Sequence, residues 1–391
     1  MYRIAVIGRG LIGSAAARHL TEAMDGIVCI GPDEPEDRHR HRGVFASHYD
    51  EGRMTRRVDP FREWSITAGN SIQRYHDLEK RSGITFYSPV GYLGLGQPGS
   101  TYNVRCAETA KAYGVDIERL DASAIRARYP YLCVPDETDG LVENGGAGYI
   151  SPRRMVAAQT RIAEQVGATC IRQPARAVRV APKGVEIVLW DGSLVVAEKA
   201  LIAAGAFTAA CGLAAAELGL TVFGRTTVLV RIEGAASEAL GDMPAMIDTR
   251  LGAYILPPIL YPDGHHYLKI GVGRDTDPRF TALEDLQGWF RSEGSTIDRR
   301  EFTALLKVLF PVLKDCAVWL TETCAVTQTA SGLPIIDYIE GDRIAVAVGG
   351  CGKGAKGADE WGRIAAGLIS SRHWSSEVTR EQLALPKQAV S

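Results

Sequence analysis

The sequence has little that would suit a membrane-spanning, nucleic-acid-binding or disulfide-rich protein. It has no apolar run of about 18–20 residues, the length that a membrane-spanning helix needs. Its net charge is only −2, so it lacks the excess of basic residues that binds nucleic acid or anionic membranes. Its eight cysteines include no CxxC pair, which argues against a zinc site or a disulfide framework and favours reduced thiols.

The chain is instead long, apolar and rich in glycine. Its 391 residues and 46% hydrophobic content predict two domains with a sizeable core. The first predicted strand begins at residue 3 and no charged-then-apolar leader precedes it, so we expect a cytoplasmic protein. The 42 glycines suit a protein with several nucleotide-binding loops.

The N-terminal stretch RIAVIGRGLIGSAAARHL has the pattern of a dinucleotide-binding turn. Its first apolar residues predict a buried parallel strand, and a helix follows the glycines. Gly8 permits the tight turn, Gly10 lets a pyrophosphate approach the backbone, and Gly13 allows the helix to pack closely on the strand. The free amides and the positive end of this helix favour phosphate groups.

The acidic residue that should bind the ribose is displaced. The second strand ends at Gly31, where such motifs usually carry Asp or Glu. Either Asp33 or Glu34 reaches the ribose from the following loop, or that contact is lost. No arginine directly follows this strand, so the motif gives no support for NADP.

Strand–glycine–helix patterns recur at residues 4–20, 200–210 and 343–370. A plain NAD domain needs only the first of them. A second glycine loop near the C-terminus indicates a larger, enclosed cofactor, so the pattern points to FAD and a discontinuous cofactor domain.

Helices are predicted at residues 60–80, 150–168 and 282–312, and Asp191-Gly192 predicts a hairpin.

Five segments resemble the sarcosine oxidase branch of the FAD-dependent D-amino acid oxidase superfamily, which includes N-methyltryptophan oxidase. They are the first glycine motif, Ser47-His48 with Arg53 and Arg56, YLKIG at residues 267–271, Cys324-Ala-Val-Thr-Gln-Thr with Ile335-Ile336-Asp337, and Gly350-Cys-Gly-Lys-Gly-Ala-Lys356. The resemblance covers nearly the full length of the chain.

The resemblance implies a role for each matched residue. Arg53 lies beside the flavin, while Arg56 and Lys356 bind the substrate carboxylate. Lys269 lies over the flavin. Cys324 begins a hairpin that residues 335–337 close, and it bonds covalently to the flavin 8α-methyl carbon, with Cys351 as the next candidate for that bond. Three departures concern the substrate pocket: Tyr49 and Lys353 replace histidines, and Val326 replaces an aromatic residue.

The chemistry of these residue types agrees with the implied roles. Arginine binds a carboxylate through two parallel hydrogen bonds, and lysine adds a point charge. Positive charge also disfavours the ammonium form of a nearby amine, which must be neutral when a hydride passes to flavin N5. Lys269 would stabilise the anion that forms when oxygen takes up an electron.

Each residue also has an ordinary structural interpretation. The arginines at positions 53, 56 and 57 could form a solvated loop, Lys269 could face water, and Cys324 could be an inert buried thiol. Tyr254 is either a wall of the pocket or structural. Two rival functions also remain: a dehydrogenase of the same fold that uses another electron carrier, and a flavin-binding protein without turnover.

The expected fold is α/β, with a discontinuous Rossmann-like FAD-binding domain of the D-amino acid oxidase type and a mixed-sheet α+β substrate domain. The FAD domain comprises residues 1–85, 145–218 and 318–391, and the substrate domain comprises residues 86–144 and 219–317. The predicted catalytic residues are Arg53, Arg56, Tyr254, Lys269 and Lys356. The predicted FAD contacts are Gly8, Gly10, Leu11, Ile12, Gly13, Asp33, Ser47, His48, Arg53, Val178, Ala204, Gly205, Cys324, Gly350, Gly352, Gly354 and Lys356.

We expect no metal site. The partners are a small amine or amino acid and O2, with no nucleic acid or membrane, and the protein is a monomer or a small homo-oligomer. The sequence does not name the substrate: sarcosine, other N-methyl amino acids, cyclic imino acids and larger conjugates all fit the implied chemistry.

Overall fold

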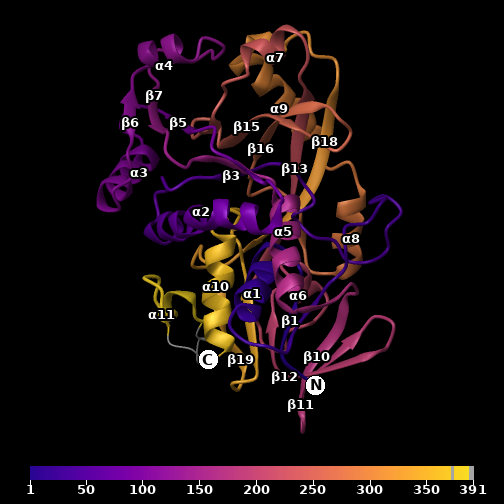
Figure 1. Ribbon diagram of the computed structural model, residues 1–391. Coiled ribbons are helices and arrows are strands. Elements are labelled where there is room, and N and C mark those ends of the chain that lie inside the picture. The colour runs from indigo at the N-terminus through magenta and orange to yellow at the C-terminus, as the bar shows by residue number, and fades with distance from the viewer. Residues whose placement is uncertain (371–373, 387–391) are drawn as a thin grey trace, which may run out of the picture.

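Two large β-sheets, stacked as two tiers, organise the chain in the computed structural model, which describes residues 1–370 and 374–386 (Figure 1). The lower tier holds the eight-stranded sheet and the upper tier holds the nine-stranded sheet. In the described part of the chain, no helix is long and apolar enough to cross a membrane.

The eight-stranded sheet has a parallel centre, a parallel edge at β9 and antiparallel strands on the opposite side. Its order is β10-β11-β12-β1-β2-β9, with β20 paired to β12 and β19 paired to β20. Its strands are β1 (Tyr2–Ile7), β2 (Ile27–Ile30), β9 (Thr169–Ile171), β10 (Ala175–Ala181), β11 (Gly184–Leu189), β12 (Leu194–Ile202), β19 (Ile335–Glu340) and β20 (Ile344–Val348). Residues 4–7, 27–30, 200–202 and 344–348 of the parallel strands are apolar and buried, because both faces of the sheet are covered there. The predicted hairpin at Asp191-Gly192 joins β11 to β12.

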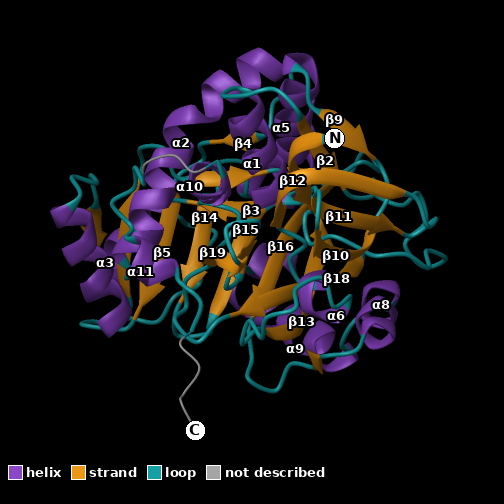
Figure 2. Cartoon of the chain, turned by 90° about the horizontal axis from the view of Figure 1, so that it is seen from below, coloured by secondary structure: helices purple, strands orange, loops and turns teal. Residues whose placement is uncertain are grey.

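Helices α1 (Leu11–Thr21), α5 (Pro152–Val166), α10 (Ala358–Ile369) and α2 (Arg62–Ser82) form one layer, in which α1 packs between α5 and α10. The predicted ends of α5 are confirmed. The Ser151 side chain accepts a hydrogen bond from the Arg154 amide, and Gly167 ends the helix in the left-handed conformation. Seen from below, α2 and α5 lie on one side of the strands, and α8 (Leu283–Arg291) and α9 (Thr296–Leu309) lie on the opposite side (Figure 2).

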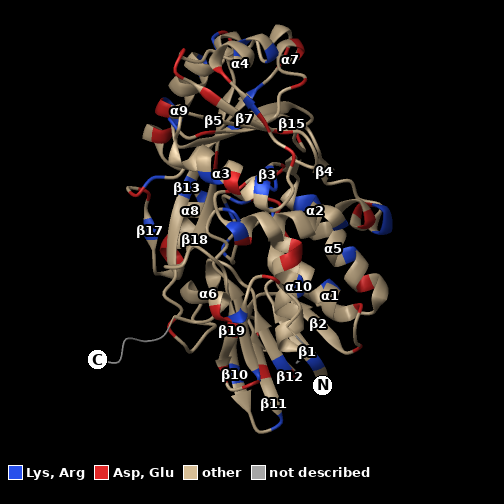
Figure 3. Ribbon diagram, turned by 90° about the vertical axis from the view of Figure 1, so that its left-hand side faces the viewer, with Lys and Arg blue, Asp and Glu red and all other residues tan. Residues whose placement is uncertain are grey.

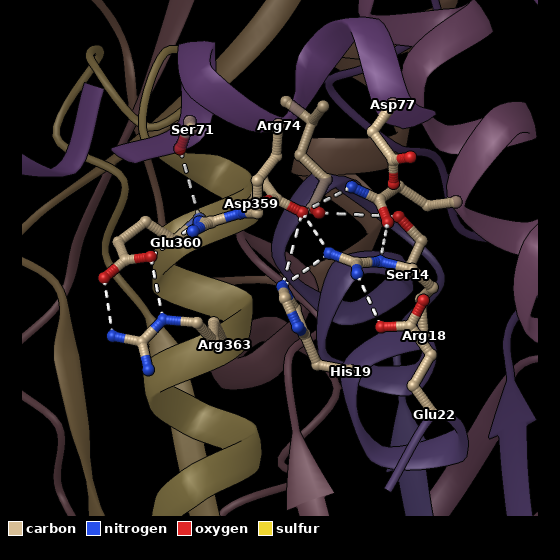
Figure 4. A network of polar contacts seen from close by, with 12 residues as sticks. Ser14, Arg18, His19, Glu22, Ser71, Arg74, Asp77, Asp359, Glu360 and Arg363 are labelled. Atoms are coloured by element: carbon tan, nitrogen blue, oxygen red, sulfur yellow. Dashed lines mark hydrogen bonds and ion pairs between the residues drawn. The ribbon is translucent and has the colours of Figure 1, made fainter. Parts of the chain in front are cut away.

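A buried polar network ties these four helices together (Figure 4). The Asp359 carboxylate on α10 accepts hydrogen bonds from Arg18 on α1 at 2.6 Å and from Gln159 on α5 at 2.8 Å, and it also pairs with Arg74 on α2. Burial alone would raise the pKa of Asp359, but His19 and the two arginines hold it well below its usual value.

Replacing Asp359 by alanine should lower the free energy of unfolding by about 3–5 kcal/mol, because Arg18 and Arg74 each lose a fully buried carboxylate partner. Urea unfolding at neutral pH measures the change. The contribution is complete above the pKa of an unfolded aspartate, at about pH 4, and is lost as the pH falls further. Glu22→Ala is the matched control, since that carboxylate pairs with Arg18 at the solvent-exposed rim; its cost should stay below about 1 kcal/mol. Equal losses in both variants would contradict this account.

The nine-stranded sheet has the order β17-β13-β16-β15-β14-β5-β7-β6, with β18 paired to the other edge of β13. Its strands are β5 (Tyr92–Gly96), β6 (Glu118–Leu120), β7 (Asp139–Glu143), β13 (Thr221–Arg231), β14 (Ala245–Asp248), β15 (Ala253–Leu260), β16 (His266–Val272), β17 (Arg279–Phe280) and β18 (Trp319–Gln328). Helix α9 packs on β13 and β16 and closes a core that contains Phe302, Leu306 and Phe310.

Short elements complete the fold. A three-stranded sheet of order β3-β8-β4 lies at the junction of the tiers. The short elements are β3 (Arg53–Thr55), β4 (Tyr87–Ser88), β8 (Gly148–Ile150), α3 (Thr101–Ala112), α4 (Ala122–Arg128), α6 (Phe207–Ala210), α7 (Ala235–Ala239), α11 (Arg380–Leu383) and the 3₁₀ helix η1 (Pro311–Leu313). Charges of both signs are scattered over both tiers, with Lys and Arg gathered near β3 (Figure 3).

The α/β fold is the predicted one, but the hairpin expected to begin at Cys324 is wrong. Strand β18, which carries Cys324, pairs along its whole length with β13 in the upper sheet. Residues 335–337 instead lie in β19, which pairs with β20 in the lower sheet. Strand β13 runs alongside all ten residues of β18 and pairs with the backbone groups on that edge, so the chain crosses between sheets rather than folding back. The division into two discontinuous domains stays a prediction.

Candidate active site

A deep cavity lies where three parallel strands of the lower sheet end. Its wall includes residues from the turn after β1, the turn after β12 and the loop after β20. Predicted contacts that line it are Gly8, Gly10, Leu11, Ile12, Ala204, Gly205, Gly350, Gly352 and Gly354. The carboxyl ends of parallel strands are the usual place for a nucleotide in such sheets.

The three glycines of the first turn are required for different structural reasons. Gly8 has φ +110°, and a Cβ on it would lie 2.4 Å from the Ala203 carbonyl oxygen. A Cβ on Gly13 would lie 1.8 Å from the Gly8 carbonyl oxygen, so Gly13 serves packing and does not line the cavity. A Cβ on Gly10 would meet nothing nearer than His48 Nδ1 at 4.0 Å. Gly10 therefore leaves space in the cavity wall at the start of α1. The N-terminus of α1 has no side-chain cap, so its free amides and this space together form a cradle that fits a pyrophosphate.

Residues 47–53 form the opposite wall, where Ser47, His48 and Arg53 all line the cavity. The Ser47 hydroxyl donates to the Ala325 carbonyl at 2.8 Å, and Arg53 donates to the Ser47 carbonyl at 3.1 Å. Burial lowers the pKa of His48 to about 3, so the imidazole is neutral. Its buried Nδ1 has no hydrogen-bond partner among the described residues, which fits a group bound in the cavity.

Besides Gly13 and Lys356, two predicted cofactor contacts, Asp33 and Val178, do not line this cavity. The Asp33 carboxylate binds Arg9 at 2.9 Å and Arg172 at 2.8 Å, so two guanidinium groups already hold it. Arg9 crosses over Gly31, whose added Cβ would lie 2.9 Å from the Arg9 amide nitrogen. Val178 is in β10, and the neighbouring residues 174 and 175 line the cavity in its place.

Lys269 lies in the upper sheet and is 1% exposed. Its ammonium group donates to the Asp50 carboxylate and, at 3.3 Å, to the Gly52 carbonyl. Arg53 pairs with the same carboxylate, so one acid holds two cations at the junction of the tiers. The Tyr254 ring lies over Gly271, where a Cβ would be 2.5 Å from the ring, and this tyrosine lines neither described cavity.

A second cationic cluster surrounds Asp59, which is fully buried. The Lys356 ammonium donates to its carboxylate at 2.5 Å, Lys353 donates at 3.2 Å, and Arg56 lies at 3.4 Å. Burial would raise the pKa of Asp59, but the charges of Lys356 and Arg56 hold it well below its usual value. Burial in turn lowers the pKa of Lys356 to about 7.

The Asp59 cluster brings the predicted carboxylate-binding residues together, but a carboxylate of the chain already occupies part of it. Three cations face one acid, so the cluster keeps a positive excess. Arg56 also bonds the Tyr102 hydroxyl at 2.7 Å and stacks on Tyr92, and its Nη1 is buried without a partner among the described residues. The cluster adjoins the cavity through residues 354 and 355, since Lys356 itself does not line it.

Cys324 lines the cavity, whereas Cys351 does not. The Cys351 thiol donates to the Gly349 carbonyl at 3.1 Å and contacts the Thr329 hydroxyl at 3.4 Å, so it is occupied within its own loop. Lys353 and Lys356 both bind Asp59, so neither directs an unpaired charge toward Cys324. Arg9 and Arg53 line the cavity together with Cys324.

The family described as FAD dependent oxidoreductase matches residues 3–368 of this chain. The chain belongs to this family. Its cofactor is FAD, and the cradle at the start of α1 and the three strand ends fit that cofactor. When bound, FAD supplies the two-electron acceptor that no side chain provides.

The curated relatives include N-methyl-L-tryptophan oxidase from Escherichia coli and from Shigella dysenteriae, each 27% identical over 212 residues. That alignment covers 52% of this chain and 54% of each relative, so the chain spans about half the length of the curated relatives it matches.

Solved structures share the fold of this oxidoreductase. NikD, described as an unusual amino acid oxidase essential for nikkomycin biosynthesis, has a TM-score of 0.77 at 17% identity, covering 98% of this chain and 97% of that one. Glycine oxidase from Geobacillus kaustophilus has a TM-score of 0.76 at 18% identity, covering 99% of each chain. L-proline dehydrogenase from P. horikoshii has a TM-score of 0.77 at 17% identity, covering 98% of this chain and 96% of that one.

Sequence reasoning missed three residues of the oxidoreductase site: Arg9, Asp50 and Asp59. Asp50 lies three residues before Arg53, and Asp59 lies three residues after Arg56. The sequence offered one signal for these pairs: an acidic residue precedes the run of arginines and another follows it. Outside a helix, however, a spacing of three residues does not bring side chains to one face, so that signal does not identify the pairs.

Proposed function

We propose that this oxidoreductase oxidises the C–N bond of a small amine-bearing acid, a secondary or N-methyl amino acid, to the imine. The observation that carries the proposal is the buried Asp59 cluster, where Arg56, Lys353 and Lys356 retain a positive excess beside the loop that lines the FAD cavity. Arg56 offers a free donor at Nη1 for a substrate carboxylate.

The same charges prepare the amine for oxidation. A positively charged neighbourhood lowers the pKa of a bound ammonium group and so favours the neutral amine that reacts. Lys356 has a pKa lowered to about 7 by burial, so near neutral pH part of its population is able to accept the proton that the substrate loses. Tyr92 and Tyr102 hold Arg56 in place from the side of β5 and α3.

We further propose O2 as the electron acceptor, which makes the enzyme an oxidase. Overall, the amine and O2 become the imine and H2O2. Lys269 carries this proposal, because its buried ammonium group lies beside Arg53, a residue of the cavity wall. A preorganised positive charge stabilises the negative charge that develops on oxygen.

Turnover with two acceptors tests the proposal. Purified enzyme is given sarcosine, other N-methyl amino acids and cyclic imino acids, first in air and then under nitrogen with a redox dye. An oxidase consumes oxygen and releases peroxide at a rate comparable to the dye rate. Dye reduction without oxygen uptake would identify a dehydrogenase instead, and no turnover with either acceptor would favour a flavin-binding protein.

Covalent attachment of FAD to Cys324 is a separate prediction. Cys324 lines the cavity that fits FAD, and such a bond requires a cysteine with access to the flavin. Acid precipitation should leave the yellow colour in the pellet, and Cys324→Ala should release it, while Cys351→Ala serves as the control and keeps it. Colour that remains in the supernatant of the wild-type protein would show that FAD is not covalently bound.

We also propose that the enzyme works in the cytoplasm as a monomer or small homo-oligomer. All eight cysteines lie in the described part of the chain and are free thiols, which supports a reducing compartment. Size-exclusion chromatography with light scattering determines the oligomeric state.

A further inference from the structure

Lys269 and Asp50 form a buried ion pair between the two tiers. Lys269 is 1% exposed and Asp50 is 7% exposed. Besides the Lys269 ammonium group, the Asp50 carboxylate accepts a hydrogen bond from the Tyr261 hydroxyl at 2.9 Å and from its neighbouring Glu51 amide at 2.8 Å, and it pairs with Arg53. The Gly52 amide also donates to it at 3.4 Å, so five partners fix this carboxylate in one orientation.

The pair lies at the wall of a second cavity of about 330 Å³. This cavity shares Arg53 and Cys324 with the FAD cavity, so the two adjoin. Asp50 lines it. Lys269 pairs across strands with Leu229 and is two residues from Tyr267, and both of these neighbours line the cavity. A small oxidant such as O2 entering here would approach the flavin site beside the ion pair.

The surroundings of Lys269 decide whether it carries a proton. Burial lowers its pKa strongly and Arg53 lowers it further, whereas Glu322 and the Cys324 thiol on β18 act in the opposite direction. The Asp50 carboxylate, in direct contact with the ammonium group, also favours the charged form of the lysine. Other ionisable groups around the pair include Glu51, Tyr254 and Tyr261.

We propose that Asp50 is a positioning residue that keeps Lys269 protonated, so that the reaction of reduced FAD with O2 is insensitive to pH across the neutral range. The inference rests on the proposed role of Lys269 in oxygen chemistry. In that reaction two electrons and two protons pass to O2, which becomes H2O2. Lys269 supplies positive charge and Asp50 supplies none of these protons.

Reoxidation of photoreduced enzyme tests the proposal without any amine substrate. The flavin is reduced by light under nitrogen and mixed with oxygenated buffer between about pH 6 and about pH 9, where an ordinary lysine stays charged. The wild-type rate should be flat. In Asp50→Asn, Lys269 loses its proton as the pH rises, so the rate should fall by about 10²-fold toward that of Lys269→Met. Tyr261→Phe, which removes a hydrogen bond but keeps the carboxylate, should stay flat.

A readout that does not depend on flavin chemistry accompanies the kinetics. In the Asp50→Asn enzyme, the unpaired Lys269 has a folded-state pKa below its unfolded value, so the unfolded chain binds more protons. The unfolding temperature of this variant should therefore rise toward the wild-type value as the pH rises. The double variant Asp50→Leu/Lys269→Met, which removes both charges, should show no such trend. It replaces Asp50→Asn as the test variant if Asp50→Asn folds poorly.

Each outcome decides one question. A flat reoxidation profile in Asp50→Asn, together with slow reoxidation in Lys269→Met, would overturn the role of Asp50 and leave the proposed function standing. A falling profile that persists in the double variant would also overturn it, because Lys269 is absent there. Reoxidation of Lys269→Met at the wild-type rate would overturn both this inference and the proposed oxygen chemistry of Lys269.

Discussion

Replacing Lys269 by methionine should slow the reaction of the reduced enzyme with O2 by about 10²–10³-fold, while FAD stays bound. The substitution removes a buried ammonium group that lies beside Arg53 on the cavity wall. It leaves the Asp59 cluster untouched, so reduction of the flavin by substrate should be largely unchanged. Stopped-flow mixing of reduced enzyme with oxygen measures the effect.

Lys111→Met is the matched control, because Lys111 is an exposed lysine on α3. It should reoxidise at the wild-type rate. Should Lys269→Met reoxidise as fast as this control, Lys269 has no part in oxygen chemistry and the acceptor is to be sought elsewhere.

Replacing Arg56 by methionine should lower kcat/KM for the amino acid substrate by roughly 30-fold to several thousand-fold, which corresponds to about 2–5 kcal/mol. The guanidinium group is buried, pairs with Asp59 and carries the free Nη1 donor that we assign to the substrate carboxylate. Its removal also leaves Asp59 with fewer cations. Reoxidation by O2 should be unaffected, because Lys269 belongs to the other cluster.

Arg62→Met provides the comparison for this substitution. Arg62 is the first residue of α2, and its side chain is 47% exposed. It should keep kcat/KM within about twofold of the wild type, since exposed charge pairs contribute little. Substrate affinity that survives in Arg56→Met would mean that the carboxylate binds elsewhere.

The glycine motifs predicted the cofactor site because their physical requirements are local. A turn with positive φ at Gly8 and a helix packed against a strand at Gly13 leave almost no choice of residue. The same applies to the ends of α5, where Ser151 and Gly167 supply a cap and a left-handed turn. The α/β fold and the FAD cavity therefore followed from the sequence and its family resemblance.

The pairing of charges did not follow, because it depends on contacts between distant segments. Lys269 meets Asp50 across 219 positions of the chain, and Lys356 meets Asp59 across 297. Each predicted cationic residue pairs with a carboxylate of the chain itself. The family resemblance did not imply these acidic partners. The sequence did not predict that β18 and β19 lie in different sheets, for the same reason. Strand β18 pairs with β13, which lies about one hundred residues earlier in the chain.

The central claim is that this oxidoreductase takes electrons from an amine-bearing acid bound at the Asp59 cluster. Anaerobic titration of the purified yellow enzyme with secondary amino acids tests it most directly, by following the oxidised-flavin absorbance near about 450 nm. We expect complete bleaching by at least one N-methyl or cyclic amino acid, and much slower bleaching of Arg56→Met by the same compound. Flavin that bleaches with dithionite but with none of these amino acids, or that bleaches equally fast in Arg56→Met, would contradict the claim.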